Sequence, residues 1–165
     1  MGNRIQILDA EQATLKLDRI AYEIVERNLQ ESHLILAGIV DRGASIARLL
    51  QQKIEAISRI KVSLFHIEVS KESPLDARLL EEGLPADEVI LMVDDVANSG
   101  STLLYASRLL LSFRPRLLQV AVLIDRQHKR FPVSPDYTGL CLSTTLQDHI
   151  EVVITEGRVQ GAYLD

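Results

Sequence analysis

The segment from Val89 to Thr102, VILMVDDVANSGST, constrains the fold of this chain more than any other. Its first five residues form an unbroken apolar run of strand length, which is typical of a parallel strand covered by helices on both faces. Two adjacent carboxylates, Asp94 and Asp95, follow the run, and a short polar turn around Gly100 then leads into a helical pattern of leucines. This order predicts an α/β fold with a ligand site at the end of the strand.

The polar turn after the acidic pair has the features of a phosphate-binding loop. A helix that begins there presents unpaired backbone N–H groups and a partial positive charge, so it can hold a phosphate without a lysine. Gly100 lets the backbone approach a ligand closely, and Ser99, Ser101 and Thr102 add hydroxyl donors. The carboxylates beside the turn can accept hydrogen bonds from vicinal hydroxyls or help to hold a hard divalent cation. Phosphate donors next to diol acceptors predict a sugar phosphate as the ligand.

Two other interpretations of this stretch compete with a sugar phosphate site. The structural alternative is that a strand ends in Asp, as in many α/β proteins, and that an ordinary helix cap follows the glycine. The second alternative is a receiver-type domain, in which adjacent carboxylates cradle a metal. In that class the acidic pair follows the first strand, whereas here at least two apolar strands precede it, so the sugar phosphate site is favoured.

A second unit of strand, polar loop and helix lies earlier in the chain. The run from Leu34 to Val40 predicts a central strand, and Asp41-Arg42-Gly43 separates it from the next helical pattern. Two such units can place the ends of two parallel strands at one crevice. Arg42 and Gly43 could then meet a second anion by charge and backbone N–H groups, although an arginine in a loop is often only a surface residue.

The rest of the chain continues the alternation of helices and strands, and residues 1–165 are expected to form a single domain. The further predicted elements are a helix that begins with an Asp9–Gln12 capping box, strands at 60–69, 117–124, 138–142 and 151–154, and a helix at 103–113. The stretch 70–88 is predicted to be a surface connection with a short helix at 75–82, or alternatively a mobile arm.

Composition and charge narrow the classes of function. A net charge of -5 and a pI near 5.4 argue against a generally basic nucleic-acid binder. Six basic residues between Arg108 and Arg130 nevertheless form a local run that could bind RNA or be a solvated surface. The lone Cys141 cannot form an internal disulfide and is expected to pack inside the protein. Because no apolar stretch resembles a signal or a membrane span, a cytoplasmic protein without membrane contact is expected.

Longer segments of the chain resemble a known family. The segments ILDAEQ, RIAYEIVERN, LAGIVDRGASIARLL, VILMVDDVANSGST, VAVLIDRQHKRFPV and PDYTG occur in the order found in the family of bifunctional pyrimidine operon regulators and uracil phosphoribosyltransferases. The acidic pair with its glycine turn resembles the phosphoribosyl pyrophosphate (PRPP) signature of type I phosphoribosyltransferases. The resemblance extends from about Ile7 to Val153. It implies the type I fold, with a central, mostly parallel sheet flanked by helices.

The resemblance also implies roles for individual residues. It makes Asp94 and Asp95 the acceptors for the ribose hydroxyls, and it assigns them to catalysis together with Arg42 of the pyrophosphate loop. The further PRPP-binding residues that it implies are Asp41, Gly43, Ala97, Asn98, Ser99, Gly100, Ser101 and Thr102. Arg126 and His128 would lie on the base side, and Asp136 with Tyr137 matches a later segment of unassigned role. Magnesium would arrive with the pyrophosphate rather than at a metal site of the protein, and a homodimer is implied.

The implied reaction moves the phosphoribosyl group from PRPP to a ring nitrogen of a nucleobase, with uracil as the favoured acceptor. The transition state resembles an oxocarbenium ion, so the protein need only align the reactants and stabilise the departing pyrophosphate. Two alternative functions stay open. One is a regulator that binds RNA and senses pyrimidine nucleotides in the same pocket, and the other is a catalytically weak relative that keeps nucleotide binding.

Three departures from the family pattern bear on these alternatives. The phosphate loop has Ala97-Asn98 where the family usually carries bulkier residues, and Ser101 where the regulator commonly has arginine. An anion site made of backbone N–H groups does not depend on those side chains. The segment from His66 to Glu88 is much shorter than the flexible hood of the family and lacks its Tyr-Arg element. Because that loop closes over the reacting sugar, its shortening bears on catalysis more than on binding.

Overall fold

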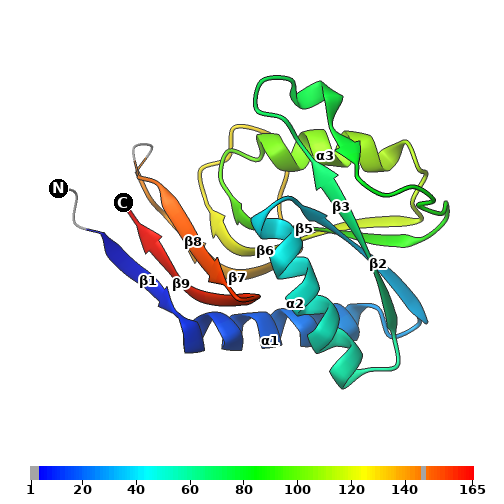
Figure 1. Ribbon diagram of the computed structural model, residues 1–165, viewed down its shortest axis with the longest axis horizontal. Coiled ribbons are helices and arrows are strands. Elements are labelled where there is room, and N and C mark those ends of the chain that lie inside the picture. Colours follow the sequence, from blue (N-terminus) through cyan, green and yellow to red (C-terminus); the bar gives the residue numbers. More distant parts are fainter. Residues whose placement is uncertain (1–3, 146–147) are drawn as a thin grey trace.

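A computed structural model describes residues 4–145 and 148–165, which form two β-sheets and three α-helices (Figure 1). The larger sheet has the strand order β4-β3-β2-β5-β6-β7, and the smaller has the order β1-β9-β8. The elements are β1 Ile5–Asp9, α1 Ala10–Arg27, β2 His33–Ile39, α2 Arg42–Ile57, β3 Lys61–Glu68, the 3-10 turn η1 Pro74–Asp76, β4 Arg78–Leu79, β5 Val89–Ala97, α3 Ser101–Leu111, β6 Leu117–Arg126, β7 Tyr137–Leu142, β8 Ile150–Thr155 and β9 Arg158–Leu164.

The larger sheet is parallel except for the short strand β4, which confirms the predicted α/β fold. Helices α1 and α2 cover one face of this sheet and α3 covers the other (Figure 1). The apolar runs of β2 and β5 are buried throughout because helices lie on both faces. The capping box of α1 is also confirmed, since Gln12 N–H donates to Asp9 Oδ1 at 2.7 Å and Gln12 Oε1 accepts from Asp9 N–H at 3.0 Å.

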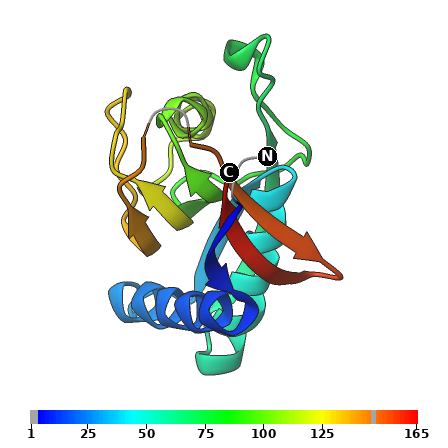
Figure 2. The same ribbon diagram turned by 90° about the vertical axis from the view of Figure 1, so that its left-hand side faces the viewer.

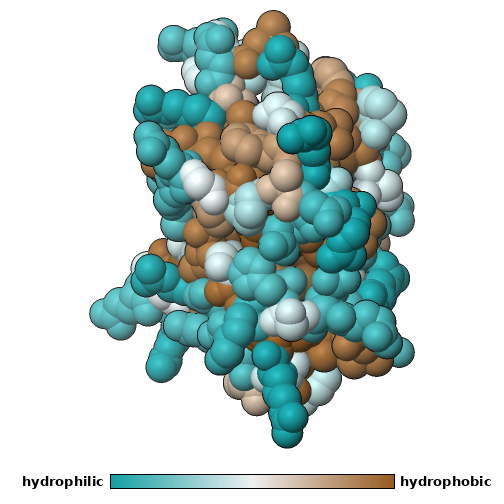
Figure 3. Space-filling model, turned by 90° about the vertical axis from the view of Figure 1, so that its right-hand side faces the viewer, coloured by the Kyte–Doolittle hydropathy of each residue, from teal (hydrophilic) through white to brown (hydrophobic). Residues whose placement is uncertain are grey.

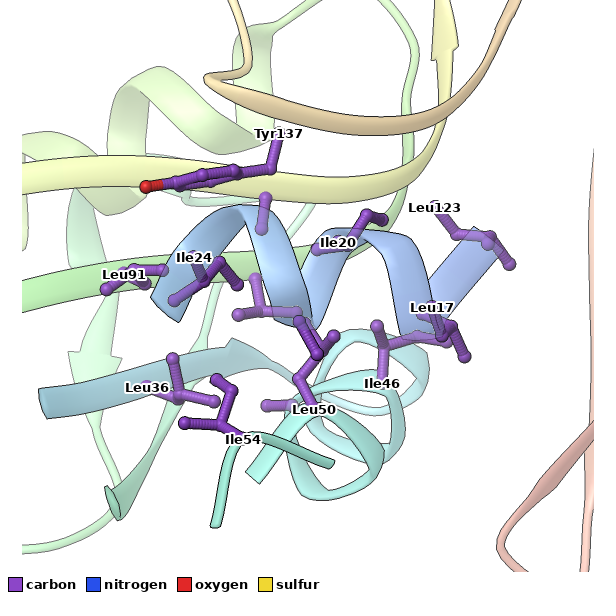
Figure 4. Packing of buried hydrophobic residues seen from close by; sticks show 14 of the residues in the cluster. Leu17, Ile20, Ile24, Leu36, Ile46, Leu50, Ile54, Leu91, Leu123 and Tyr137 are labelled. Carbon is purple, nitrogen blue, oxygen red and sulfur yellow. The ribbon is translucent and has the colours of Figure 1, made fainter. Parts of the chain in front are cut away.

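The principal core lies between the sheet and the two helices α1 and α2 (Figure 4). Its largest members include Leu17, Ile20 and Ile24 from α1, Ile46, Leu50 and Ile54 from α2, and Tyr137 from β7. The hydroxyl of the fully buried Tyr137 donates to Gln119 Oε1 at 3.1 Å. Asp136 accepts the Val120 N–H at 2.8 Å. The Asp136–Tyr137 segment, whose role the sequence left open, therefore fastens β7 to β6.

The smaller antiparallel sheet contains two strands, β1 and β9, that were not predicted from the sequence. Ile5 pairs with Leu164 and Asp9 with Gly161, so the two ends of the described chain lie side by side (Figure 2). Strand β1 has only five residues, and β9 carries Gly161 in its interior, so neither has a strong local signal. Their stability comes from a pairing between the two ends of the chain, which periodicity alone cannot detect.

The segment 70–88 is a surface connection, but the helix predicted at 75–82 is wrong. It holds only the η1 turn and β4, and β4 pairs with the end of β3. Glu81 fastens the connection to β3, because its carboxylate accepts the His66 N–H at 2.8 Å and also contacts His66 Nδ1. Partial burial acts to raise the pKa of Glu81, but the hydrogen bonds and charge of His66 outweigh it and lower that pKa.

Cys141 is exposed, so the expectation that it packs in the interior is wrong. It lies near the carboxyl end of β7, which is the edge strand of the larger sheet, beyond the buried residues Tyr137 and Gly139. The face that carries the amino ends of the strands is mostly hydrophilic, with separate hydrophobic areas (Figure 3). No helix in the described part of the chain is long and apolar enough to cross a membrane.

The turn between β8 and β9 provides a test of local strain. Glu156 and Gly157 have φ values of 51° and 71°, the positive values that a two-residue type I′ hairpin turn requires. Asparagine tolerates this backbone region better than glutamate, so Glu156→Asn should raise the free energy of unfolding by about 0.5 kcal/mol. Urea denaturation checks this value, with Glu72→Asn as a surface control. A stability equal to or below that of the wild type would show that the turn is not strained.

Candidate functional site

The candidate site lies at the carboxyl ends of the parallel strands, on the left-hand side of Figure 1. The loops after β2, β5 and β6 all end at this edge, as expected for a ligand crevice in an open α/β sheet. A pocket of about 40 Å³ opens between the end of β5 and the start of α3. Its lining includes Asp94 and the whole turn Ser99–Thr102. At 10–15 Å³ for each water-sized group, this pocket has room for roughly three such groups.

The turn before α3 has the backbone geometry of an anion site. Gly100 has a φ of 87°, which favours glycine, and a Cβ placed there would lie 3.3 Å from the Phe131 carbonyl oxygen. Ser99 Oγ accepts the Ser101 N–H at 3.2 Å. Within the described chain, no acceptor is bonded to the N–H groups of Thr102 and Leu103. The first turn of α3 therefore presents donors and the positive end of its dipole at the pocket.

The two carboxylates are held close together at the end of β5. Asp94 Oδ1 accepts the Asp95 N–H at 2.9 Å, and Asp95 Oδ1 accepts the Val96 N–H at 2.9 Å. Burial raises the pKa of Asp94 well above its usual range, and the charge and side-chain hydrogen bond of Asp95 add to that effect. Asp94 thus retains a proton more readily than an isolated carboxyl group. Hydroxyl groups that donate to these oxygens would favour the ionised form.

The loop that contains Gly43 packs directly against the acidic pair. A Cβ on Gly43 would lie 2.6 Å from the Val93 carbonyl oxygen and 3.1 Å from Asp94 Oδ1. Gly38 on β2 allows a similar approach, since its Cβ would lie 2.6 Å from Ala44 Cα. The first turn of α2 therefore sits on the ends of β2 and β5. This confirms that the two predicted strand ends meet at one edge. The Val40–Asp41 peptide bond in this loop is cis.

Arg42 is half-exposed and faces the smaller sheet. Its Nη2 atom lies 3.6 Å from Glu151 Oε1 on β8. With Asp41 and Ser45, it lines a hollow of about 290 Å³ between α2 and β8. This hollow is separate from the one that contains Asp94, so the structure brings Gly43 to the acidic pair more closely than it brings the Arg42 side chain.

The predicted base-side residues have different surroundings. Arg126 is held by three acceptors, since Nε donates to Thr144 Oγ1 at 2.8 Å, Nη1 to Asn98 Oδ1 at 3.2 Å, and Nη2 to the Thr145 carbonyl at 2.6 Å. It therefore links Asn98, just before the Ser99–Thr102 turn, to the segment after β7. His128 is exposed in the next loop. Their contact with a base stays a prediction.

Lys129 was counted in the sequence only as a member of the basic run and was not assigned to the candidate site. Its side chain is only 18% exposed, pairs with Asp125 and donates to the Arg126 carbonyl. The neighbouring N–H groups of Arg130 and Phe131 donate to the Ser99 carbonyl at 2.9 and 3.1 Å. The loop after β6 is thus fastened onto the Ser99–Thr102 turn. The sequence signal that could have indicated this role is the spacing of Lys129 four residues after Asp125, which lies near the end of β6.

The basic residues between Arg108 and Arg130 are spread over different parts of the molecule. Strand β6 separates them, because Arg114 and Arg116 precede the strand while Lys129 follows it. Ten residues at about 3.3 Å each place the two groups about 30 Å apart. Arg116 is also engaged by Glu31, whose hydrogen bonds and charge raise the pKa of Arg116. The run forms no single surface, and RNA binding stays a prediction.

The chain is similar to known proteins in both sequence and structure. Residues 3–159 match the family model described as phosphoribosyl transferase domain. A protein named "Bifunctional protein PyrR" from Halalkalibacterium halodurans is 35% identical, over 91% of this chain and 90% of that protein. One of the same name from Brevibacillus brevis is 34% identical, over 94% and 93%. The crystal structure of the hypoxanthine phosphoribosyltransferase of Trypanosoma cruzi has a TM-score of 0.73 at 20% identity, over 84% of this chain and 81% of that one, and it shows the shared fold.

Proposed function

This chain belongs to the phosphoribosyl transferase domain family, and on that premise we propose that it transfers the phosphoribosyl group of PRPP to a nucleobase, with uracil as the acceptor. The choice of uracil rests on the resemblance to bifunctional PyrR proteins. In this proposal, residues 1–165 form one domain, and the protein is a cytoplasmic homodimer.

The position of Asp94 is the observation that carries the proposal. Asp94 lines the pocket of the Ser99–Thr102 turn, and its Oδ1 atom would lie 3.1 Å from a Cβ on Gly43. A single carboxylate therefore lies between two loops that can each bind an anion. PRPP has this order of groups, with a phosphate and a pyrophosphate at the two ends of a ribose that carries vicinal hydroxyls.

In the proposed complex, each part of PRPP has a protein partner. The 5'-phosphate accepts hydrogen bonds from the backbone of the Ala97–Thr102 turn, and the ribose hydroxyls donate to Asp94 and Asp95. The pyrophosphate meets the backbone of Asp41–Gly43, with Arg42 providing positive charge. Magnesium enters as part of the PRPP substrate. The carboxylate oxygens of Asp94 and Asp95 are hard ligands of the kind that magnesium prefers, so they could contact the hydrated ion.

The proposed reaction exchanges two bonds at C1 of the ribose. The bond from C1 to the pyrophosphate oxygen breaks, and a bond from C1 to a ring nitrogen of the base forms, while that nitrogen gives up its proton to the departing pyrophosphate or to water. Positive charge develops on the sugar in the transition state, next to the ionised acidic pair, and negative charge develops on the departing pyrophosphate, next to Arg42. Holding the base and C1 within reach of each other supplies the remaining acceleration.

Binding and turnover can be tested separately. Ribose 5-phosphate should shift the backbone amide NMR signals of Ser99–Thr102, whereas ribose, which lacks the phosphate, should not. Incubation with PRPP and magnesium should then yield pyrophosphate and uridine monophosphate from uracil, with hypoxanthine as the comparison base. Shifts confined to other regions would contradict the phosphate assignment. Binding without product from either base would instead support the catalytically weak alternative, in which the short connection 70–88 does not close the site.

A further inference from the structure

A large hollow lies between α2 and the β8–β9 turn, away from the pocket that contains Asp94. We call it the α2–hairpin groove. It measures about 510 Å³, within the range of about 300–1,000 Å³ that small-molecule sites occupy. The polar residues that line it are Ser45, Arg48, Gln52, His66, Glu156 and Arg158. None of them lines the pocket of the Ser99–Thr102 turn.

The polar wall of the groove follows from the helical period of α2. Ser45, Arg48 and Gln52 are spaced at i, i+3 and i+7, so they share one face of the helix. Buried residues such as Ile46 and Leu50 occupy the opposite face and hold the helix against the sheet. The polar face is therefore fixed in position by the core behind it.

The opposite wall is fixed by the tight β8–β9 hairpin (Figure 2). The positive φ values of Glu156 and Gly157 close the turn in two residues, and Thr155 pairs with Arg158 across it. Arg158 is consequently held at the first position of a regular strand. The groove is thus formed by two ordered elements.

The charges in the groove favour an anion. Neither Arg48 nor Arg158 forms an ion pair or a side-chain hydrogen bond with any described residue. Glu156 supplies one carboxylate to the lining. His66 contacts Glu81 through Nδ1, which leaves Nε2 as the ring atom available to a ligand. Two guanidinium groups on opposite walls can bind phosphate oxygens with bidentate geometry.

We propose that the α2–hairpin groove binds the oligophosphate group of a small molecule, such as the tail of a nucleotide, at a site outside the catalytic pocket. Ser45 also lines the hollow that contains Arg42, so the groove adjoins the proposed pyrophosphate loop. A ligand in the groove would therefore lie next to the catalytic site without occupying the phosphate turn.

Isothermal titration calorimetry with inorganic tripolyphosphate tests this site in the full-length protein. The double variant Arg48→Gln/Arg158→Gln should weaken binding at one site at least about ten-fold, as expected when charge-assisted hydrogen bonds to phosphate are removed. The matched control Arg59→Gln/Arg114→Gln removes the same charge from exposed positions outside the groove and should leave the affinity unchanged. Equal losses in both double variants would show nonspecific attraction of a polyanion and overturn the proposal.

NMR locates the bound tripolyphosphate and separates this proposal from the proposed catalytic function. Signals from the Gly157 amide, the Gln52 side-chain amide and the His66 ring should shift, and they should still shift in Asp94→Asn. Shifts limited to Asp41–Gly43 and Ser99–Thr102 would mean that only the catalytic site binds phosphate, and would overturn the proposal. The proposal would also be overturned if the Arg48→Gln/Arg158→Gln variant changed its sedimentation but kept its affinity for tripolyphosphate. The groove would then be an interface between copies of the chain. Circular dichroism confirms that each variant is folded.

Discussion

Asp94→Asn should lower phosphoribosyl transfer by about 100-fold or more while making the folded protein more stable. The loss of activity is expected because the amide cannot supply the negative charge that faces the developing positive charge on the sugar. It also donates hydrogen bonds where the ribose hydroxyl needs an acceptor. The gain in stability is expected because the native structure buries this carboxyl group beside a second one. An amide of nearly equal size removes that cost.

The pH dependence of the same variant follows from the raised pKa of Asp94, which burial causes first and Asp95 increases. In the unfolded chain this carboxyl titrates near its ordinary value of about 3.9. A group whose pKa is higher in the folded state contributes its full stability below the unfolded value, and this contribution is lost as pH rises through the folded value. Wild type and Asp94→Asn should therefore differ little in Tm at pH 4, and the variant should be increasingly more stable toward pH 8.

The exposed Asp87 provides a matched control, since Asp87→Asn changes the same charge away from the site. It should alter neither turnover nor the shape of the Tm profile. Thermal unfolding monitored by circular dichroism across pH, together with initial rates of uridine monophosphate formation, gives both readouts. A lower Tm for Asp94→Asn at pH 8 would mean that the native structure favours the ionised carboxylate and would contradict the raised pKa of Asp94. Full activity would remove Asp94 from the proposed mechanism.

The central part of the fold could be read from the sequence because its signals are local. The apolar run from Val89 to Val93, the acidic pair and the glycine turn each lie within a few residues of one another, and the structure joins them in the predicted order. The loop at Gly43 could be placed at the same edge because parallel strands end together. What the sequence could not give was the close packing of Gly43 on Asp94, which depends on the relative position of two separate units.

The remaining misses involve contacts between distant parts of the chain. The strands β1 and β9 stabilise each other across almost the full sequence, and neither has enough alternation to be recognised alone. The basic residues between Arg108 and Arg130 show the opposite case. They are close in sequence, but β6 places them at its two ends, so they do not form one surface. Lys129 was overlooked because its importance comes from a loop that folds back onto the Ser99 turn. Local pattern therefore located the Ser99–Thr102 turn between β5 and α3 and could not locate the side chains that surround it.

Gly43→Ala should destabilise the protein by roughly 2 kcal/mol and weaken PRPP binding. A Cβ at this position would lie 2.6 Å from the Val93 carbonyl oxygen and 3.0 Å from Asp94 Cα, and both atoms belong to the backbone of a buried central strand. Overpacking of this kind costs about 3 kcal/mol. Alanine gains about 1 kcal/mol in helix propensity within α2, so the collision outweighs the gain. Urea denaturation measures the stability, and titration calorimetry measures PRPP affinity.

Gly83→Ala separates the collision from the general effects of adding a methyl group. Gly83 has a φ of 82° and no atom within 4 Å of its would-be Cβ, so alanine there should cost only about 1 kcal/mol of backbone strain and leave PRPP affinity unchanged. If Gly43→Ala were as well tolerated as Gly83→Ala, the β2–α2 loop would be free to move away from β5. The arrangement in which Asp94 lies between two anion-binding loops would then not be rigid. Because Gly43 is the residue that permits that arrangement, the comparison tests the geometry on which the proposed function rests.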